Sequence, residues 1–467
     1  MTALDYKKIV ADYQEDFLND LFELLRVPSV REDDQATAEF PVGPGPAKAL
    51  HKFLEFGKRD GFTVQNFDNW AGHIEMGEGN ELMGILGHVD VVPVGTGWDT
   101  DPFEPVLKEG RIYARGSSDD KGPSLAAYYA LKIIKDLKLP VAKKIRLIIG
   151  TDEESGWQCM DHYFSVEKMP DFGFSPDAVF PIINGEKGNV TVQLHFGGNQ
   201  SGDIKLIRFE SGLRSNMVPQ DAEATLEVKD LDAVIASFEE FLTSEPITGS
   251  YEQNGTQLIL HVVGKAAHGS TPEVGINGAT YLGKFLQTLG LSQDAKTFVD
   301  VTAQVLHDDP KGEKLGVAMV DDVMGELSAN AGVFRFEEGK GGTITINMRY
   351  PKGTDEEITQ KITQQLASYD VTVEKAAGGK LPHYVSPEDP LVKTLLDVYH
   401  RQTGLEAHEQ VIGGGTYGRL MDRGVAYGAL FPDSIDTMHQ ANEFMALDDL
   451  MRSMAIYLEA IYELVRP

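Results

Sequence analysis

His88 follows an apolar run over residues 82–86, and Asp90 comes two residues later. On an extended backbone alternate side chains point to the same side, so we expect His88 and Asp90 to face the same space. A metal-bound histidine needs its second ring nitrogen fixed, and a nearby carboxylate often does this. The pair therefore indicates a metal ligand with its orienting acid. The alternative is a loop histidine that lies near an acid by chance.

Three further acidic groups lie beside expected elements. They are Asp119-Asp120 before an expected helix over residues 121–137, Glu153-Glu154 after the strand-like run 145–149, and Asp177 after a short apolar run. Each group has an ordinary explanation when taken alone. An acid can cap a helix N-terminus, adjacent acids are common on solvated loops, and aspartate forms turns. Their shared position relative to the strands favours a common site instead.

The elements that must position these groups alternate between strand-like and helical patterns, which is typical of an α/β layer with a largely parallel sheet. In an open parallel sheet the carboxyl ends of the strands converge on one crevice, where ligands bind. Several carboxylates gathered there beside one histidine would repel one another, and a divalent cation would remove this cost. Histidine and carboxylate donors without cysteine suit Zn²⁺ or Mn²⁺ and exclude a structural thiolate zinc site.

The pattern changes from about Gly188 and returns to α/β after about Lys380. Between them lie strand-like runs at 190–196, 258–263 and 343–348 and helical patterns at 231–242, 279–289 and 356–366, with a charged loop at 337–342. This order predicts one or two α+β units of the split β-α-β kind. We therefore expect a discontinuous catalytic domain over residues 1–185 and 382–467, with helices at 391–399 and 447–464. A second domain over residues 186–381 is inserted into it.

The composition limits the class of protein. The 467 residues include 72 acidic and 42 basic side chains, a formal charge of -30, and 42% are hydrophobic. An acidic surface repels phosphate backbones and acidic membranes, which argues against both as partners, although plain solubility also explains the charge. One cysteine, Cys159, excludes an intrachain disulfide and matches no nucleophile motif. The N-terminal segment reads as an amphipathic helix with an apolar stripe from Ile9 to Leu25, not as a signal peptide. No apolar run reaches membrane-spanning length, so we expect a cytoplasmic protein.

Several motifs resemble the signature blocks of the M20 metallopeptidases, a family of aminoacylases, carboxypeptidases and dipeptidases with a pair of metal ions. The blocks are Gly87-His88-Val89-Asp90-Val91-Val92-Pro93, Arg115-Gly116-Ser117-Ser118-Asp119-Asp120-Lys121-Gly122, Thr151-Asp152-Glu153-Glu154-Ser155, Ser175-Pro176-Asp177-Ala178 and Met438-His439-Gln440-Ala441-Asn442-Glu443. The resemblance covers essentially the whole chain. The peptidase V dipeptidase branch is similar also at residues 40–46, 58–62 and 413–419.

The resemblance implies a role for each matching position. His88 and Asp177 would bind one metal ion, Glu154 and His439 the other, and Asp119 would bridge the two. Asp90 would orient His88. Glu153 would stay unligated and act as the general base that takes a proton from a metal-held water and passes it to the leaving amine.

The resemblance also makes the inserted domain a lid. His268 would reach the active site and steady the oxyanion of the tetrahedral intermediate. Asn216, Arg349 and the 413–419 loop, with Gly414 and Thr416, would hold the substrate carboxylate, for which arginine and backbone amides are natural donors. Without the resemblance His268 is an ordinary turn histidine and Arg349 a surface residue of a strand.

The sequence thus predicts a metal-dependent dipeptidase that acts on unblocked dipeptides, and some tripeptides, with two Zn or Mn ions per chain. A first alternative is removal of an acyl group from an N-acyl amino acid by the same chemistry. A second, from another class, is a non-catalytic peptide-binding protein, against which the intact Glu153 and the complete ligand set argue. The lid is long, over residues 186–381, as in the peptidase V branch, where extra lid replaces a partner subunit. We therefore expect a monomer.

Overall fold

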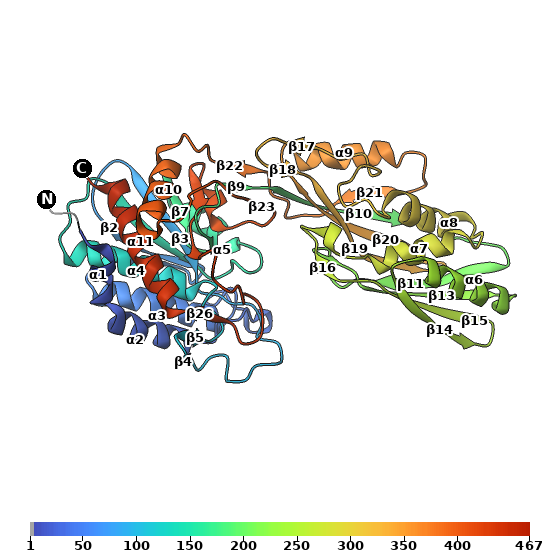
Figure 1. Cartoon of the computed structure of the whole chain (residues 1–467), viewed down its shortest axis with the longest axis horizontal. Coiled ribbons are helices and arrows are strands. Elements are labelled where there is room, and N and C mark those ends of the chain that lie inside the picture. Colours follow the sequence, from blue (N-terminus) through green and yellow to red (C-terminus); the bar gives the residue numbers. More distant parts are fainter. Residues whose placement is uncertain (1–3) are drawn as a thin grey trace. The chain divides into compact units, whose positions relative to one another are not determined.

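The computed structural model describes residues 4–467 and consists of two compact units (Figure 1). Unit 1 comprises the chain up to Gly185 together with Tyr384–Gln410 and Gly415–Pro467. Unit 2 comprises Glu186–His383 and the short segment Val411–Gly414. The chain therefore passes between the units four times, and the 411–414 segment leaves unit 1 to join unit 2.

Unit 1 is built on a six-stranded sheet. In spatial order its strands are β1 (Thr63–Phe67), β2 (Ala71–Met76), β6 (Lys144–Gly150), β3 (Leu82–His88), β7 (Phe172–Ser175) and β24 (Gly424–Ala426). The last four are parallel to one another, and β1 and β2 are antiparallel additions at one edge. Every residue of β3 is buried, as is typical of a strand covered on both faces. This confirms the largely parallel α/β sheet.

Helices surround this sheet. They are α1 (Tyr6–Ala11), α2 (Gln14–Leu25), α3 (Pro44–Arg59), α4 (Lys121–Asp136), α5 (Gln158–Val166), α10 (Pro390–Thr403) and α11 (Leu447–Val465). The long helices α4 and α11 pack against each other and are buried along most of their length (Figure 1). Small strands complete the unit: β4 (Val106–Lys108), β5 (Arg111–Tyr113), β8 (Ala178–Val179), β25 (Ala429–Leu430) and β26 (Phe444–Ala446).

The expected single N-terminal helix is wrong in one respect, because the chain forms two helices, α1 and α2. The break lies at Asp12 and Tyr13. The backbone N–H of Asp12 donates a hydrogen bond to the carbonyl of Ile9 and ends the first helix. The break lets α1 pack on α11 while α2 packs on α3 and α4.

Unit 2 has an eight-stranded antiparallel sheet. In spatial order its strands are β14 (Thr248–Asn254), β15 (Gln257–Val263), β13 (Asp221–Val228), β11 (Ile204–Ser211), β19 (Ser328–Glu337), β20 (Gly341–Tyr350), β10 (Gly188–Phe196) and β21 (Thr372–Lys375). Buried and half-buried residues alternate along β10, so one face of the sheet joins the core. The core also contains residues of α6 (Leu231–Ser244), α7 (Gly278–Gln287), α8 (Gln293–Asp300) and α9 (Asp355–Gln365). Unit 2 is thus a single α+β unit, with helices packed on one sheet.

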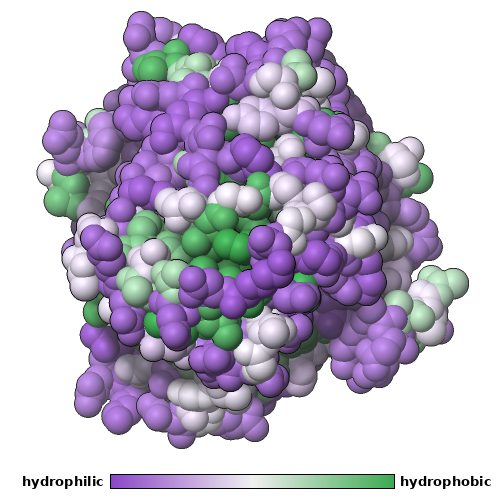
Figure 2. Space-filling model, turned by 90° about the vertical axis from the view of Figure 1, so that its right-hand side faces the viewer, coloured by the Kyte–Doolittle hydropathy of each residue, from purple (hydrophilic) through white to green (hydrophobic). Residues whose placement is uncertain are grey.

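The remaining strands are short. They are β12 (Met217–Val218), β16 (Ala267–His268), β17 (Val320–Asp321) and β18 (Gly325–Glu326) in unit 2, and β9 (Gly185–Glu186), β22 (His383–Tyr384) and β23 (Val411–Ile412) near the points where the chain changes unit. Hydrophilic residues cover most of the face shown in Figure 2, around a smaller apolar area. Among the described residues, no helix combines the length and apolar composition needed to cross a membrane.

Candidate metal centre and active site

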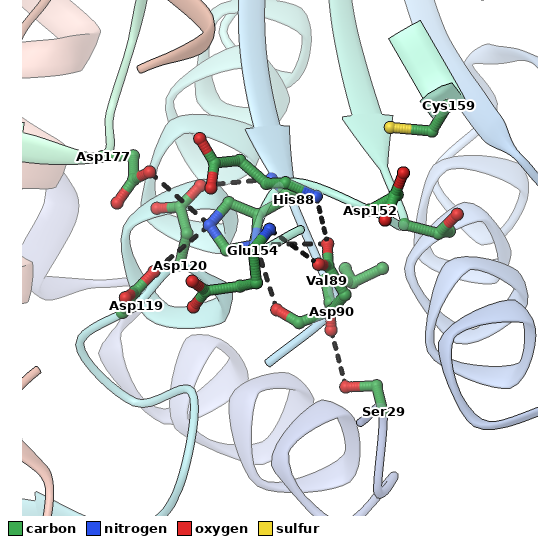
Figure 3. Close-up of polar contacts among 12 residues, drawn as sticks. Ser29, His88, Val89, Asp90, Asp119, Asp120, Asp152, Glu154, Cys159 and Asp177 are labelled. Atoms are coloured by element: carbon green, nitrogen blue, oxygen red, sulfur yellow. Dashed lines mark hydrogen bonds and ion pairs between the residues drawn. The ribbon is translucent and has the colours of Figure 1, made fainter. Parts of the chain in front are cut away.

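The three groups expected at strand ends lie at one edge of the unit 1 sheet. His88 is the last residue of β3, Glu153 and Glu154 follow β6, and Asp177 follows β7. These strands are parallel and adjacent, so their carboxyl ends bring the side chains together (Figure 3). Asp119 reaches the same place from the residues that precede α4.

His88 is buried and lies between carboxylates. Its Nε2 is 3.1 Å from Oδ1 of Asp119 and 3.5 Å from Oδ2 of Asp177. Within residues 4–467 that nitrogen makes no hydrogen bond of good geometry. Its Nδ1 lies 3.0 Å from the backbone carbonyl of Asp90 and 3.4 Å from Oδ1 of the same residue. Donation from Nδ1–H to that carbonyl leaves the Nε2 lone pair directed at the carboxylates, as a metal ligand requires.

Asp119 stands between two histidines. Its Oδ1 faces His88, while its Oδ2 lies 2.9 Å from Nε2 of His439. The same His439 nitrogen is 3.3 Å from Oε2 of Glu154. The two oxygens of one carboxylate thus point to two different donor groups, which is the arrangement of a ligand that bridges two ions.

The donor atoms are close enough to share cations. Donor atoms of His88, Glu153 and Asp177 lie within 4.8 Å of one another, and so do those of His88, Asp119 and Glu154. All are imidazole nitrogen or carboxylate oxygen, a set that fits Zn²⁺ or Mn²⁺. The arrangement therefore fits a pair of divalent ions.

The electrostatics of the cluster agree with this fit. Burial, together with the charge of Asp119, raises the pKa of Glu154 to about 7 and also raises the pKa of Asp177. Burial and the neighbouring carboxylate of Asp177 hold the pKa of Glu153 well above its ordinary value, against the opposing effect of His88. Close carboxylates in a buried space resist ionisation, and divalent ions would relieve the repulsion.

Asp90 has a second set of contacts besides His88. Its Oδ1 accepts a hydrogen bond from the backbone N–H of Glu153 over 3.1 Å, and its Oδ2 accepts one from the N–H of Glu154 over 3.0 Å. Asp90 therefore fixes the main chain of both glutamates. Sequence spacing alone gave no sign of these bonds, because the partners are more than sixty positions apart.

Asp152 also holds this loop, a role that its sequence position did not predict. Its carboxylate accepts hydrogen bonds from the backbone N–H groups of Gly156 over 3.3 Å and Gln158 over 3.0 Å. Arg31 pairs with the same carboxylate at 2.6 Å. The only available signal was its place beside the two glutamates.

Asp120 and Cys159 take part differently. Among the described residues Asp120 caps no backbone N–H of α4; its Oδ2 accepts hydrogen bonds from the His88 N–H over 3.2 Å and from Ser124 Oγ over 2.6 Å. Cys159 is buried with its Sγ 3.0 Å from the Tyr417 hydroxyl, and burial raises the pKa of its thiol to about 12. Such a thiol is a poor nucleophile.

Candidate substrate-binding residues gather within unit 2. His268 on β16 pairs with Met217 on β12, and the N–H of Gly269 donates to the carbonyl of Asn216 over 2.8 Å. The Nδ1 of His268 accepts a hydrogen bond from the N–H of Ser270 over 3.1 Å and lies 2.6 Å from the Ser270 hydroxyl. This turn therefore places Asn216 and His268 side by side.

The 411–414 segment lies next to that turn. A Cβ placed on Gly413 would stand 3.1 Å from Cβ of Ser270 and 3.6 Å from Cγ of Arg349. Gly414 follows at once, so the structure brings it into the same neighbourhood within unit 2. Thr416 belongs to unit 1, where its hydroxyl accepts a hydrogen bond from the N–H of Gly418 over 3.1 Å.

Known proteins of similar sequence support the same interpretation of this site. Residues 84–463 match the family described as Peptidase family M20/M25/M40. A protein named Beta-Ala-Xaa dipeptidase from Lactobacillus delbrueckii subsp. lactis is 45% identical, over 99% of this chain and 99% of its own. A protein of Staphylococcus haemolyticus, also named as a dipeptidase, is 45% identical over 98% of this chain and 99% of its own.

Solved structures share the fold at low sequence identity. Human carnosine dipeptidase 1 is 16% identical with a TM-score of 0.58, covering 98% of each chain. The aminoacylhistidine dipeptidase of Vibrio alginolyticus is 14% identical with a TM-score of 0.58, covering 96% of each chain.

Proposed function

The chain belongs to peptidase family M20/M25/M40, and from this premise we propose that it is a dipeptidase that hydrolyses the peptide bond of unblocked dipeptides with two metal ions, Zn or Mn. The observation that carries the proposal is the position of Asp119, whose two carboxylate oxygens face His88 and His439 separately. A site for a single ion would not need the two oxygens of Asp119 to face different histidines.

Five side chains hold the ions in this proposal. His88 and Asp177 would hold the first, Glu154 and His439 would hold the second, and Asp119 would contribute to both. When bound, such a pair polarises the scissile carbonyl and lowers the pKa of water. The protein supplies a fixed geometry for this chemistry, with His88 oriented through its Nδ1 and the two glutamates held by Asp90.

Glu153 is the general base. It is held through its backbone by Asp90, and its carboxylate lies beside His88 and Asp177, where it can take a proton from water and give it to the leaving amine. The adjacent Glu154 binds metal, so the two neighbouring acids have separate tasks. His268 donates from Nε2–H to the developing oxyanion, since its Nδ1 already accepts from Ser270.

Asn216, Arg349, Gly414 and Thr416 hold the substrate carboxylate. Arg349 supplies a planar cation suited to a carboxylate, and the approach of Gly413 to Arg349 and Ser270 supports a shared pocket wall within unit 2. We propose that some tripeptides are also substrates. The relative named Beta-Ala-Xaa dipeptidase supports testing β-alanine at the amino end.

The proposal is tested with metal-stripped protein re-supplied with Zn²⁺ or Mn²⁺. The protein is offered free dipeptides, β-alanyl dipeptides, tripeptides and N-acyl amino acids. Metal-dependent cleavage of free dipeptides is the expected result and identifies the better ion. Cleavage of N-acyl amino acids alone would show a deacylase. Peptide binding without turnover of any compound would show a non-catalytic binding protein.

We also propose a cytoplasmic location and a monomeric state. The buried free thiol of Cys159 is compatible with a reducing compartment. Light scattering of the purified chain measures the mass, and a dimer would contradict the second part of this proposal.

A further inference from the structure

Glu443 is fully buried and lies four residues after His439. Its Oε1 accepts hydrogen bonds from the backbone N–H groups of Ser118 over 2.9 Å and Asp119 over 3.2 Å. The N–H of Gly116 lies 3.1 Å from Oε1 and 3.2 Å from Oε2. A carboxylate thus occupies a cradle of three backbone donors in the segment that ends at Asp119.

Arg115 closes the cradle. Its Nη1 donates to Oε2 of Glu443 over 2.7 Å, and both side chains are almost completely buried. A buried carboxylate with this many charge-assisted hydrogen bonds is held in one geometry. The backbone of the bridging acid is therefore bonded directly to the loop that carries His439.

His439 depends on its loop for its position. Its side chain is 56% exposed, so packing does little to hold it. Its φ is 62° and that of Asn442 is 59°, both in the left-handed region. Asn442 ties the loop to a second segment, because its Oδ1 accepts the N–H of Asp99 over 2.9 Å and its Nδ2 donates to Oδ2 of Asp99 over 3.1 Å.

We propose that Glu443 is a positioning residue for the second metal ion, because it fixes Asp119 and the His439 loop relative to each other. The two ligands meet at 2.9 Å between Oδ2 and Nε2, and Glu443 is bonded to the main chain of one and close in sequence to the other. His88 and Asp177, which would hold the first ion, lie at the ends of β3 and β7, and the carboxylate of Glu443 does not bond to either segment. The effect of Glu443 is thus directed at one of two metal positions.

This inference rests on the metal positions of the proposed function. The test therefore measures metal affinity by competition with a chelator and does not depend on peptide cleavage. The variant Glu443→Gln keeps the side-chain shape but removes the charge and turns an amide NH₂ toward donors. It is made in two backgrounds. Asp177→Asn weakens the first metal position, so that the measured affinity is that of the second. Glu154→Gln weakens the second position, so that the measured affinity is that of the first.

The expected result is a loss of Zn²⁺ affinity of about tenfold or more in the Asp177→Asn background, the range typical of residues that orient metal ligands. In the Glu154→Gln background the loss stays below about threefold, because only the shared Asp119 is affected. Equal losses in the two backgrounds, or no loss in either, would overturn the inference. A wild-type chain that bound no ion would overturn it together with the proposed metal centre.

Two further variants separate positioning from folding. Glu75→Gln breaks a comparable pair with Arg146, 2.6 Å apart on β2 and β6, and serves as the matched control. It should lower the melting temperature without changing metal affinity. If Glu443→Gln does not fold, Asn442→Ala loosens the same loop from its exposed side. Weaker binding at the second position then supports the inference, and unchanged binding overturns it.

Discussion

The backbone N–H of Ser270 donates a hydrogen bond to Nδ1 of His268 over 3.1 Å. A backbone N–H can only donate, so Nδ1 must present a lone pair and the ring proton must lie on Nε2. Burial, and after it the charge of Arg349, lowers the pKa of His268. The ring is therefore neutral at neutral pH and can donate its Nε2–H to an oxyanion.

We expect His268→Ala to lower kcat by about 10²–10³-fold with metal content unchanged, since one oxyanion donor is lost. Ser270→Ala keeps the backbone N–H, so it should lower kcat by less than about tenfold. Steady-state kinetics with a free dipeptide, alongside metal analysis, provide the check. Equal damage from the two substitutions would contradict the idea that the backbone bond sets the tautomer.

Glu153→Gln should lower kcat by about 10²–10⁴-fold, because the amide cannot accept the proton from water. The bonds from the Glu153 and Glu154 backbone to Asp90 do not depend on the side chain, so bound metal should stay near two ions per chain. Metal analysis and turnover on the same sample measure both quantities. Substantial remaining activity would remove Glu153 from the base role.

The sequence predicted most of what positions the centre. The strand β3 is almost entirely apolar, β6 is apolar apart from Lys144 and Arg146, and α4 and α11 have clear helical spacing, so these elements were expected close to their observed bounds. The parallel sheet followed from their alternation. The edge strands β1 and β2 were not expected, because their short mixed sequences carry little signal.

The sequence pattern could not predict contacts between residues that are far apart in the chain. Arg115 and Glu443 are 328 positions apart, and Arg31 and Asp152 are 121 apart, so each pair exists only after the chain has folded. The passage of residues 411–414 into unit 2 is also decided by tertiary packing, and spacing within the sequence does not encode it.

Asp90→Asn should weaken metal binding and turnover together. Asparagine has one acceptor oxygen where aspartate has two, so one of the bonds to the N–H groups of Glu153 and Glu154 is lost. A loss of about 10–100-fold in metal affinity is expected, measured by chelator competition. Asp33→Asn is the control, because Asp33 has a 73% exposed side chain and pairs with Arg31 outside the cluster. Unchanged affinity in Asp90→Asn would show that His88 and the glutamates are held by other contacts.

His73 should make stability depend on pH. It is buried on β2 with its Nδ1 2.7 Å from the Tyr163 hydroxyl, and burial, followed by the charge of Arg146, lowers its pKa to about 4. The unfolded chain, with a histidine pKa of about 6.5, binds the proton more tightly. Stability from neutral His73 is therefore present above pH about 6.5 and is lost as the pH falls toward about 4.

At pH 5 this loss amounts to about 2 kcal/mol of unfolding free energy. Replacement by glutamine removes the titrating group and keeps a polar side chain. Denaturant unfolding of the wild type and His73→Gln at pH 7 and pH 5 isolates the effect, because every other group titrates equally in both chains. The wild type should lose about 2 kcal/mol more than the variant between these pH values. Parallel losses would mean that His73 keeps an ordinary pKa, which burial beside Arg146 opposes.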